Sequence, residues 1–301
     1  MNLNHRSNPD AQSSLVDRLF ALLLYLLPHH ILSRGMHWLT RCRWEPLKDQ
    51  LIRGAIQLYK VDMSEAAEPN PSRYDNFNAF FTRRLRDNAR PLAMEEESIL
   101  CPVDGAVSQT GDIVDGRIFQ AKGHDFSLHE LLGGDREWAE KFAGGRYVTL
   151  YLSPQDYHRI HMPLSGMLKK MLHVPGRLFS VSPSTTRTVP RLFSRNERLV
   201  NLFDTEIGPM AVIMVGAIFV AGMDTVWAGT VTPLSQRVTR WSYTNAPSEP
   251  VFLEKGKEMG RFNMGSTVIL LFGKEAVEWG EQMAPGTKIH MGEKIAEQLT
   301  A

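Results

Sequence analysis

The pair Gly265-Ser266 stands directly before an apolar, β-branched run that ends at Phe272. Such a run predicts a buried strand, which would hold the serine rigidly at its entrance. The serine hydroxyl can fold back toward the preceding carbonyl, and glycine has no side chain to obstruct that approach. The sequence therefore allows the Gly265-Ser266 peptide bond to be attacked from within the chain. The alternative is an ordinary Gly-Ser turn ahead of a strand.

Two other places in the sequence carry reactive groups. Asp104 lies in a tight Pro-Val-Asp-Gly turn, and His158 and His161 lie three residues apart just after a predicted strand. Histidine takes and gives protons near pH 7, so this pair is where a base is expected. A metal site would need a third ligand, and no obvious one lies nearby, so we expect no metal. The aspartate could also be a turn former, and each histidine an ordinary hydrogen-bonded residue.

The composition limits the kind of partner. With 301 residues, 43% of them hydrophobic, the chain can bury a full core in one or two domains. The 34 basic and 33 acidic residues give a net charge of +1, so no global field favours a nucleic acid as partner. Cys42 and Cys101 are too few for a disulfide framework, which fits a reducing compartment. We expect both to be free thiols.

The N-terminal stretch has the composition of a membrane-surface segment. Every residue from Leu19 to Leu27 is apolar, but a spanning helix needs about twenty apolar residues, and no cleavage site of a secretory signal follows. Residues 18–43 contain arginines and Trp38 but no acidic residue, which is typical of helices in the headgroup layer. We therefore expect peripheral attachment through this region. The alternative is a core helix of a soluble domain.

A second helical pattern begins at Pro46, and the segment 69–72 breaks it. Asp75 is then expected to cap a short helix with phenylalanines on one face, followed by arginines that are either solvated or face a phosphate.

From residue 99 onward the sequence pattern changes to short runs typical of strands and broken by glycine. These runs are at 101–107, 113–120, 147–152 and 209–223. One helix is expected among them, after a capping box formed by Ser127 and Glu130. We find no internal repeat and no second Pro-rich linker. The prediction is an α+β fold with a β-rich, barrel-like single catalytic domain over residues 61–301, preceded by a helical membrane-associating region over residues 1–60.

Several blocks together resemble a known family, the bacterial phosphatidylserine decarboxylases. They are Phe77-Asn-Ala-Phe-Phe-Thr-Arg-Arg-Leu85, Pro102-Val-Asp-Gly105, Asp156-Tyr-His-Arg-Ile-His-Met-Pro163, Asn196-Glu-Arg198, Phe203-Asp-Thr-Glu-Ile-Gly-Pro-Met-Ala211 and Gly260-Arg-Phe-Asn-Met-Gly-Ser-Thr267. The blocks are spread over nearly the whole chain in the family's order. The family commonly has leucine where this chain has Met264, which is a conservative change in volume.

The resemblance implies a proenzyme that cuts itself between Gly265 and Ser266 into a large chain 1–265 and a small chain 266–301. Ser266 would become a covalent pyruvoyl group, the cofactor on which the amine of phosphatidylserine forms a Schiff base before CO2 leaves. By motif, His161 would be the base of self-cleavage, Asp104 the acid that orients it, and His158 the residue that handles protons during decarboxylation.

The resemblance also implies partners and a place in the cell. The partners are phosphatidylserine in a membrane surface, the two chains of one precursor and, as a candidate assembly, a second copy in a homodimer. The expected place is peripheral, on the cytoplasmic side of the inner membrane.

Two other functions stay open at this point. A serine hydrolase could use Asp104, His161 and Ser266 on an external ester, although the Gly-x-Ser-x-Gly elbow is missing. A non-enzymatic β domain could dock on membranes through residues 15–45. Intact mass under denaturing conditions separates both from a self-cleaving proenzyme.

Overall fold

The computed structural model describes residues 22, 24–25, 29–121, 123–218, 222–232, 236–244, 250–264 and 267–299. Two of the sequence-based expectations fall outside these ranges. Most of the apolar run from Leu19 to Leu27 does so, and so do Gly265 and Ser266 themselves. The residues on either side of that pair, Met264 and Thr267, are described.

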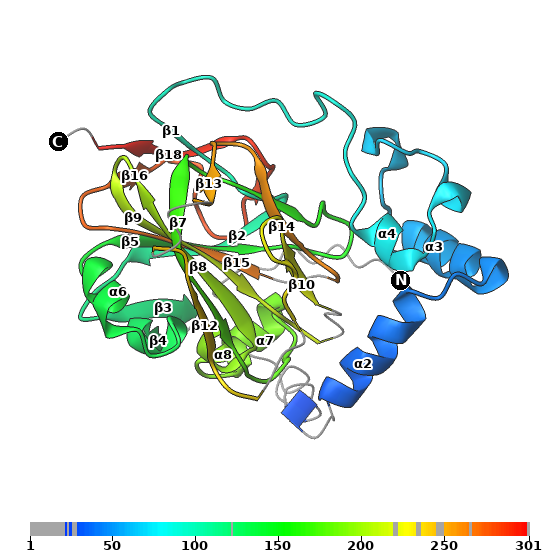
Figure 1. Ribbon diagram of the computed structural model, residues 1–301, viewed down its shortest axis with the longest axis horizontal. Coiled ribbons are helices and arrows are strands. Elements are labelled where there is room, and N and C mark those ends of the chain that lie inside the picture. Colours follow the sequence, from blue (N-terminus) through cyan, green and yellow to red (C-terminus); the bar gives the residue numbers. More distant parts are fainter. Residues whose placement is uncertain are drawn as a thin grey trace.

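The N-terminal part is helical and lies to one side of the sheets (Figure 1). Its elements are α2 (His29–Thr40), α3 (Glu45–Tyr59), the short 3-10 helices η1 (Met63–Glu65) and η2 (Pro71–Arg73), and α4 (Phe77–Phe81). The predicted helix around Pro46 is confirmed as α3, and its Ile52 packs on the phenylalanines of α4. The expected cap of α4 was wrong: Asn76, not Asp75, accepts the hydrogen bond from the backbone N–H of Ala79. Asn76 lies immediately before the helix, where an Asx side chain reaches the third N–H.

The rest of the described chain is mostly strand, interrupted by short helices. The strands are β1 (Ser98–Leu100), β2 (Gly105–Asp112), β3 (Arg117–Ala121), β4 (His124–Ser127), β5 (Arg146–Tyr151), β6 (Arg159–His161), β7 (Gly166–Val174), β8 (Arg198–Thr205), β9 (Gly208–Val215), β10 (Met223–Thr225), β11 (Gly229–Thr230), β12 (Thr239–Ser242), β13 (Phe252–Leu253), β14 (Glu258–Phe262), β15 (Thr267–Phe272), β16 (Val277–Trp279), β17 (Lys288–Ile289) and β18 (Lys294–Gln298). The helices are α5 (Leu128–Leu131), α6 (Arg136–Lys141), α7 (Pro183–Thr188) and α8 (Leu192–Arg195).

A nine-stranded sheet dominates the fold, with the order β12-β7-β8-β9-β15-β5-β2-β17 and β13 paired to β7. Its centre is β15, which pairs antiparallel with β9 on one side and with β5 on the other. All of β15 is buried, because alternate side chains enter different cores. Val268, Leu270 and Phe272 belong to one hydrophobic cluster, and Ile269 and Leu271 to another. This is why the sequence shows an unbroken apolar run instead of an alternating one.

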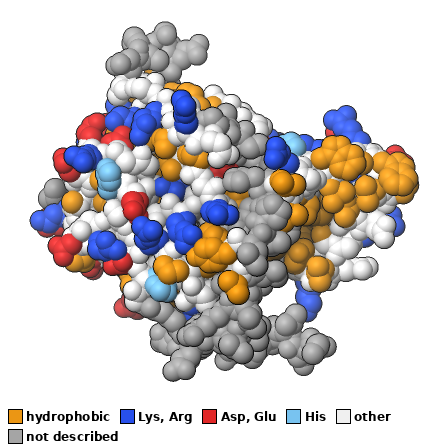
Figure 2. Space-filling view, turned by 90° about the horizontal axis from the view of Figure 1, so that it is seen from below, with side chains coloured by type: hydrophobic (Ala, Val, Ile, Leu, Met, Phe, Trp, Pro, Cys, Tyr) orange, Lys and Arg blue, Asp and Glu red, His pale blue; other side chains and the backbone are white. Residues whose placement is uncertain are grey.

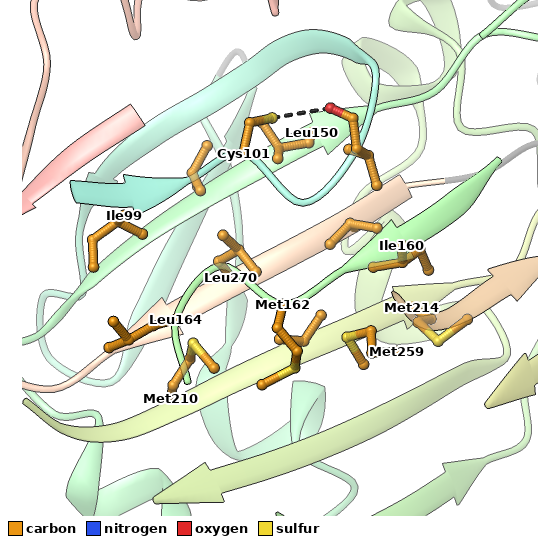
Figure 3. Packing of buried hydrophobic residues seen from close by; sticks show 14 of the residues in the cluster. Ile99, Cys101, Leu150, Ile160, Met162, Leu164, Met210, Met214, Met259 and Leu270 are labelled. Atoms are coloured by element: carbon orange, nitrogen blue, oxygen red, sulfur yellow. Dashed lines mark hydrogen bonds between the residues drawn. The ribbon is translucent and has the colours of Figure 1, made fainter. Parts of the chain in front are cut away.

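The two faces of this sheet are covered by different elements. The four-stranded sheet β11-β10-β14-β6 covers one face, where Ile160, Met162 and Met259 pack toward Leu270 of β15 (Figure 3). The hairpin of β3 and β4 and the helices α5, α6 and α8 cover the other face (Figure 1). The large sheet is therefore the middle of three layers, and its strands are held on both faces.

The predicted α+β, β-rich class is confirmed, and the described strands form no closed barrel, since β12 and β17 end the strand order without pairing to each other. The ladders between these strands are antiparallel, which excludes a doubly wound parallel sheet. The helix after the capping box is confirmed as α5, with Ser127 as its cap. The expectation of a single helix in this region was wrong, because α6, α7 and α8 are also present. Helices of four to six residues are too short to show a 3.6-residue pattern.

Among the described residues, no helix is both long and apolar enough to cross a membrane.

Candidate active site

The predicted cleavage bond comes directly before the central strand β15 in the sequence. Ser266 and Gly265 are outside the described residues, but Thr267 begins β15 and pairs with Tyr151 of β5. On the other side, Met264 packs against the phenylalanine cluster of α4. Its φ of 129° is in a region that favours glycine, so the backbone is strained just before the bond. The predicted strand after Ser266 is thus confirmed.

His158 is fully buried and has one unused ring nitrogen. Its Nδ1–H donates to the carbonyl oxygen of Asp156 at 2.7 Å, and the centre of its ring lies 4.0 Å from that of Phe81, with the two ring planes tilted by 41°. Its Nε2 has no hydrogen-bond partner within the described chain. Burial, with a contribution from the charge of Arg83, lowers the pKa of His158 to about 3. The imidazole is therefore neutral at pH 7, and the lone pair of its Nε2 can accept a hydrogen bond.

His161 is also held in one orientation, but both of its ring nitrogens are occupied. Its Nδ1–H donates to the carbonyl oxygen of Gly256 at 2.8 Å, and the hydroxyl of Tyr157 donates to its Nε2 at 3.0 Å. Burial lowers the pKa of His161 as well. To act as a base, His161 would first have to break its hydrogen bond with Tyr157.

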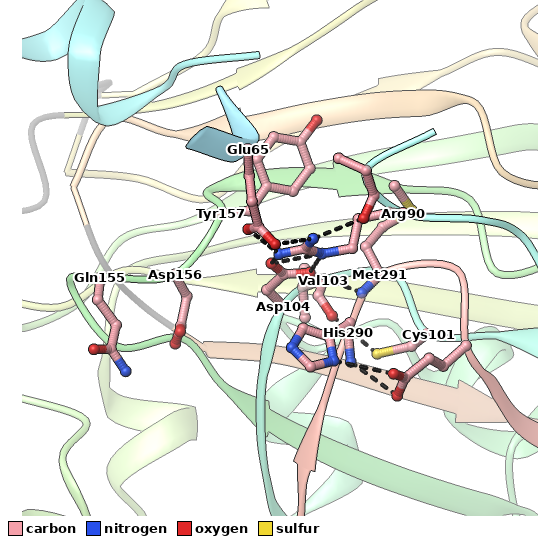
Figure 4. Close-up of polar contacts among 12 residues, drawn as sticks. Glu65, Arg90, Cys101, Val103, Asp104, Gln155, Asp156, Tyr157, His290 and Met291 are labelled. Atoms are coloured by element: carbon pink, nitrogen blue, oxygen red, sulfur yellow. Dashed lines mark hydrogen bonds and ion pairs between the residues drawn. The ribbon is translucent and has the colours of Figure 1, made fainter. Parts of the chain in front are cut away.

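Asp104 is buried in a network that involves neither histidine directly. Both of its oxygens accept hydrogen bonds from Arg90, at 2.7 to 3.1 Å, and the backbone N–H of Met291 donates to Oδ1 at 2.9 Å. Arg90 also donates to both oxygens of Glu65 (Figure 4). Within the described residues no hydrogen bond joins Asp104 to His161. The negative charge of Asp104 nevertheless acts on His161, because it opposes the effect of burial on the pKa of that imidazole. Arg90 and Met291, which bind Asp104, line one cavity of about 270 Å³ with His161.

The structure also adds residues that the sequence did not indicate. Asp156 accepts two hydrogen bonds from Ser153, from the backbone N–H at 2.6 Å and from the hydroxyl at 2.7 Å, and burial raises its pKa. Its place two residues before His158 was the one available signal. Arg90 and Glu65 had no signal in the sequence, because neither lies in a motif with a defined spacing. Only the fold brings them to Asp104.

Two cavities share Tyr151, the residue that pairs with Thr267. The first, about 540 Å³, is apolar, lies between α2, α3, α4 and the sheets, and is lined by Met264, Leu58 and Phe81 among others. The second, about 360 Å³, is polar and contains Asp104, Asp156 and Arg83. Tyr151 lines both, and Tyr151 is the residue opposite Thr267 in the β5–β15 ladder. The start of β15 therefore lies between an apolar and a polar space.

In the described chain, no group of three or more His, Cys, Asp or Glu side chains is arranged to hold a metal ion. Both cysteines are free, and the buried Cys101 thiol is close to the carbonyl oxygen of Val103 (Figure 3). Burial raises the pKa of the Cys101 thiol, so it is an inert core residue.

Fold and site together define a class: an α+β protein in which an apolar and a polar cavity share a lining residue, Tyr151, as a site for an amphipathic molecule requires. A family model described as phosphatidylserine decarboxylase matches residues 77–297, and a second model, described as PSD, matches residues 19–60. The chain belongs to the phosphatidylserine decarboxylase family.

Curated relatives are similar over almost the whole chain. The phosphatidylserine decarboxylase proenzyme of Azotobacter vinelandii is 55% identical over 281 residues, which cover 93% of this chain and 98% of the relative. The proenzymes of Stutzerimonas stutzeri and of Pseudomonas aeruginosa strain LESB58 are each 54% identical. Those matches cover 93% and 94% of this chain and 95% and 98% of the relatives, respectively.

Proposed function

We propose that this protein decarboxylates phosphatidylserine to phosphatidylethanolamine, using a pyruvoyl group that it makes from its own Ser266. The observation that carries the proposal is the environment of the two described residues that flank the Gly265-Ser266 bond. Met264 lines the apolar cavity, and Thr267 is paired with Tyr151, which lines both cavities. A lipid with a polar head and acyl chains matches this pair of spaces. Family membership supports the same reaction.

The residues present fit a carbonyl group made at position 266. Next to that position the hydroxyl of Thr267 is buried without a hydrogen-bond partner in the described chain, and so is Nε2 of His158. Buried polar atoms of this kind are usually satisfied in the working state of a protein. A pyruvoyl carbonyl supplies what no ordinary side chain offers, an acceptor for the electron pair that remains when CO2 leaves.

Self-cleavage would make this group in balanced steps. The Oγ of Ser266 attacks the carbonyl carbon of Gly265, its proton passes to a base, and the peptide C–N bond breaks to leave an ester and a free amine. Removal of the Cα proton of residue 266 expels the chain ending at Gly265 as a carboxylate and leaves dehydroalanine. Hydrolysis then releases ammonia and leaves the pyruvoyl group at the start of the small chain 266–301.

By motif, we assign the base of self-cleavage to His161, the acid that positions it to Asp104, and proton handling in decarboxylation to His158. Asp104 would act through Arg90 and the segment of Met291, since these are its hydrogen-bond partners. A second assignment exchanges the two histidines. One observation favours it: Nε2 of His158 has no hydrogen-bond partner among the described residues, whereas Nε2 of His161 accepts from the Tyr157 hydroxyl.

The helical region supports a peripheral place on a membrane. Ile31, Trp38, Trp44 and Leu58 are exposed, with 62%, 71%, 66% and 71% of their surface accessible. Hydrophobic side chains gather on the lobe that contains α2 and α3 (Figure 2). Leaving the acyl chains in the bilayer avoids a cost of about 0.8 kcal/mol for each CH2 exposed to water. We propose residues 1–60 as the membrane-associating region and 61–301 as the decarboxylase domain, on the cytoplasmic side of the inner membrane.

Intact-mass analysis of the denatured protein, combined with assay of CO2 release from phosphatidylserine, tests this function. We expect two chains, 1–265 and 266–301, the second lacking the amine of a normal N-terminus. Ser266→Ala should remain one chain and release no CO2, because it lacks both the attacking oxygen and the atoms that become the carbonyl. Ser242→Ala, at an exposed position of β12, is the control. A full-length wild-type chain that reacts with a serine-directed phosphonate would instead indicate a serine hydrolase.

A further inference from the structure

Arg83 is a buried cation without a carboxylate partner among the described residues. It is 5% exposed, and its Nη2 donates to the carbonyl oxygen of Gln155 at 3.2 Å. Its Nε has no hydrogen-bond partner in the described chain, and the guanidinium lies over the ring of Phe80, 5.6 Å from its centre. A buried charge is costly unless it is paired, and burial accordingly lowers the pKa of this guanidinium. The arrangement calls for an anion.

The polar cavity of about 360 Å³ that Arg83 lines contains four cationic side chains and four carboxylates, and of the four cations only Arg90 forms an ion pair within the described residues. Lys60 and Lys288 are exposed at its edge and form no ion pair within the described residues. Its carboxylates already have partners: Glu65 and Asp104 are bound by Arg90, Asp156 by Ser153, and Asp62 by the backbone N–H of Ser64 (Figure 4 shows the first three carboxylates and Arg90). What remains to meet a ligand is therefore Arg83 with the two lysines.

Arg83 lies near His158 and also near the apolar cavity. It follows α4, whose Phe81 contacts the ring of His158, and the charge of Arg83 contributes to the lowered pKa of that imidazole. The cavity it lines shares Tyr151 with the apolar cavity, next to the start of β15. In phosphatidylserine the phosphodiester lies between the serine group and the acyl chains. Because Tyr151 lines both cavities, a phosphodiester held in the polar cavity lies near the apolar cavity and near the start of β15, as the order of groups in this lipid requires.

We infer that Arg83, assisted by Lys60 and Lys288, binds the phosphodiester of the lipid head group, so that the polar cavity is the head-group site and selects serine that is linked to a phosphate. This inference rests on the proposed function. A guanidinium offers several N–H donors in a plane that match two phosphate oxygens, whereas an ammonium offers only a point charge. Arg83 is thus the residue that orients the phosphodiester, and the two lysines add electrostatic attraction for it.

The test uses the full-length protein and dihexanoyl phosphatidylserine, with the cleaved fraction measured by intact mass. For Arg83→Gln we expect normal cleavage, a KM at least about tenfold higher and a smaller change in kcat. The reason is that the variant cannot form the hydrogen bonds between the guanidinium and the phosphate in the complex with the lipid. Arg83→Lys should recover part of the affinity. Lys274→Gln, an exposed cation at neither cavity, is the matched control and should not change KM.

Glycerophosphoethanolamine, which has the phosphodiester but no carboxylate, identifies the group that is bound. It should inhibit the wild type competitively, and its inhibition constant should rise about tenfold in Arg83→Gln. If Arg83→Gln weakens binding of phosphatidylserine but not of this inhibitor, Arg83 holds the carboxylate and the inference is wrong. An unchanged KM in a normally cleaved Arg83→Gln also overturns it.

Two further outcomes can be distinguished from a failure of this inference. A wild-type protein that is cleaved yet releases no CO2 contradicts the proposed function, and glycerophosphoethanolamine binding, measured by calorimetry on wild type and Arg83→Gln, then still decides the anion site. If Arg83→Gln does not fold, the double variant Lys60→Gln/Lys288→Gln replaces it, since both lysines are exposed. Its inhibition constant should rise several-fold. No rise overturns the inference.

Discussion

The two histidines differ in what their ring nitrogens already do. In the part of the chain that the structure describes, the buried Nε2 of His158 has no hydrogen-bond partner, whereas both ring nitrogens of His161 form hydrogen bonds. A proton acceptor needs a lone pair within reach of the proton that it removes. The motif therefore favours His161 as the base of self-cleavage, whereas the hydrogen-bond geometry favours His158. Single substitutions can separate their roles.

On the assignment by motif, His161→Ala should remain a full-length precursor, because Ser266 loses its base. His158→Ala should be cut between residues 265 and 266 and yet release CO2 slowly, by about 10²-fold or more if it is the general acid-base. Intact mass and CO2 release measure the two effects separately. An uncut His158→Ala together with a normally cut His161→Ala would exchange the roles in favour of the free Nε2.

His158 also makes stability depend on pH. The unfolded histidine has a pKa of about 6.5, and burial lowers the native value to about 3. Between these values the unfolded chain binds a proton that the native chain does not, so the free energy of unfolding falls as the pH falls. From pH 7 to pH 5 this one group should remove about 2 kcal/mol.

Urea unfolding in the uncleavable Ser266→Ala background measures this effect on a single chain. His158→Gln should lose about 2 kcal/mol less than its parent between pH 7 and pH 5, because glutamine does not titrate. His129→Gln, at a partly exposed position in α5, is the control. Parallel pH dependences for His158→Gln and its parent would contradict the neutral, buried histidine.

At the scale of elements, β2 positions Asp104 through close backbone packing. A Cβ at Gly105 would lie 2.3 Å from the backbone carbonyl oxygen of Tyr151 in β5. That distance is too short for any non-bonded contact, and backbone cannot rotate away as a side chain can. The absence of a side chain at this residue is therefore what lets the turn that carries Asp104 lie against the ladder of β5.

We expect Gly105→Ala to lower the free energy of unfolding by about 1–3 kcal/mol and to slow self-cleavage, because β2 must move away from β5 and take Asp104 with it. The urea midpoint and the cleaved fraction over time measure the two effects. Gly35→Ala in α2 is the control, since its Cβ would meet nothing within 4 Å, and alanine should slightly stabilise the helix. Equal effects of both changes would show that the close approach does not matter.

Elements with a strong local pattern could be predicted from the sequence. The apolar run of β15, the helix α3 and the cap at Ser127 each depend on neighbours in the chain, and each is confirmed. The partners of Asp104 could not be predicted, because Arg90 and Met291 reach it from other segments and Arg90 in turn binds Glu65. Likewise, Arg83 and Arg84 are adjacent, yet the first is buried and the second exposed, which only the packing of α4 decides.

At the scale of the whole molecule, the lobe of α2 and α3 should decide membrane attachment. Replacing the exposed Trp38 and Trp44 with serine should reduce binding to anionic vesicles by about tenfold or more, since burial of a large apolar side chain contributes about 2 kcal/mol. Vesicle co-sedimentation measures this. Phe252→Ser, an exposed position in β13 beside β7, is the control. Full binding by the double tryptophan variant would place the attachment elsewhere.

The central position of β15 has a consequence for refolding. In the proposed mature protein β15 belongs to the small chain, yet it lies between β9 and β5 of the large chain, and β17 and β18 pair with β2 and β1. Once the chain is cut, a denatured molecule consists of two fragments that must meet again, so recovery becomes second order and depends on concentration. The uncut Ser266→Ala chain should regain its fold by a first-order process. At low concentration the two chains of an unfolded mature protein should rarely meet again. The lifetime of the folded mature protein is then set by its unfolding rate alone.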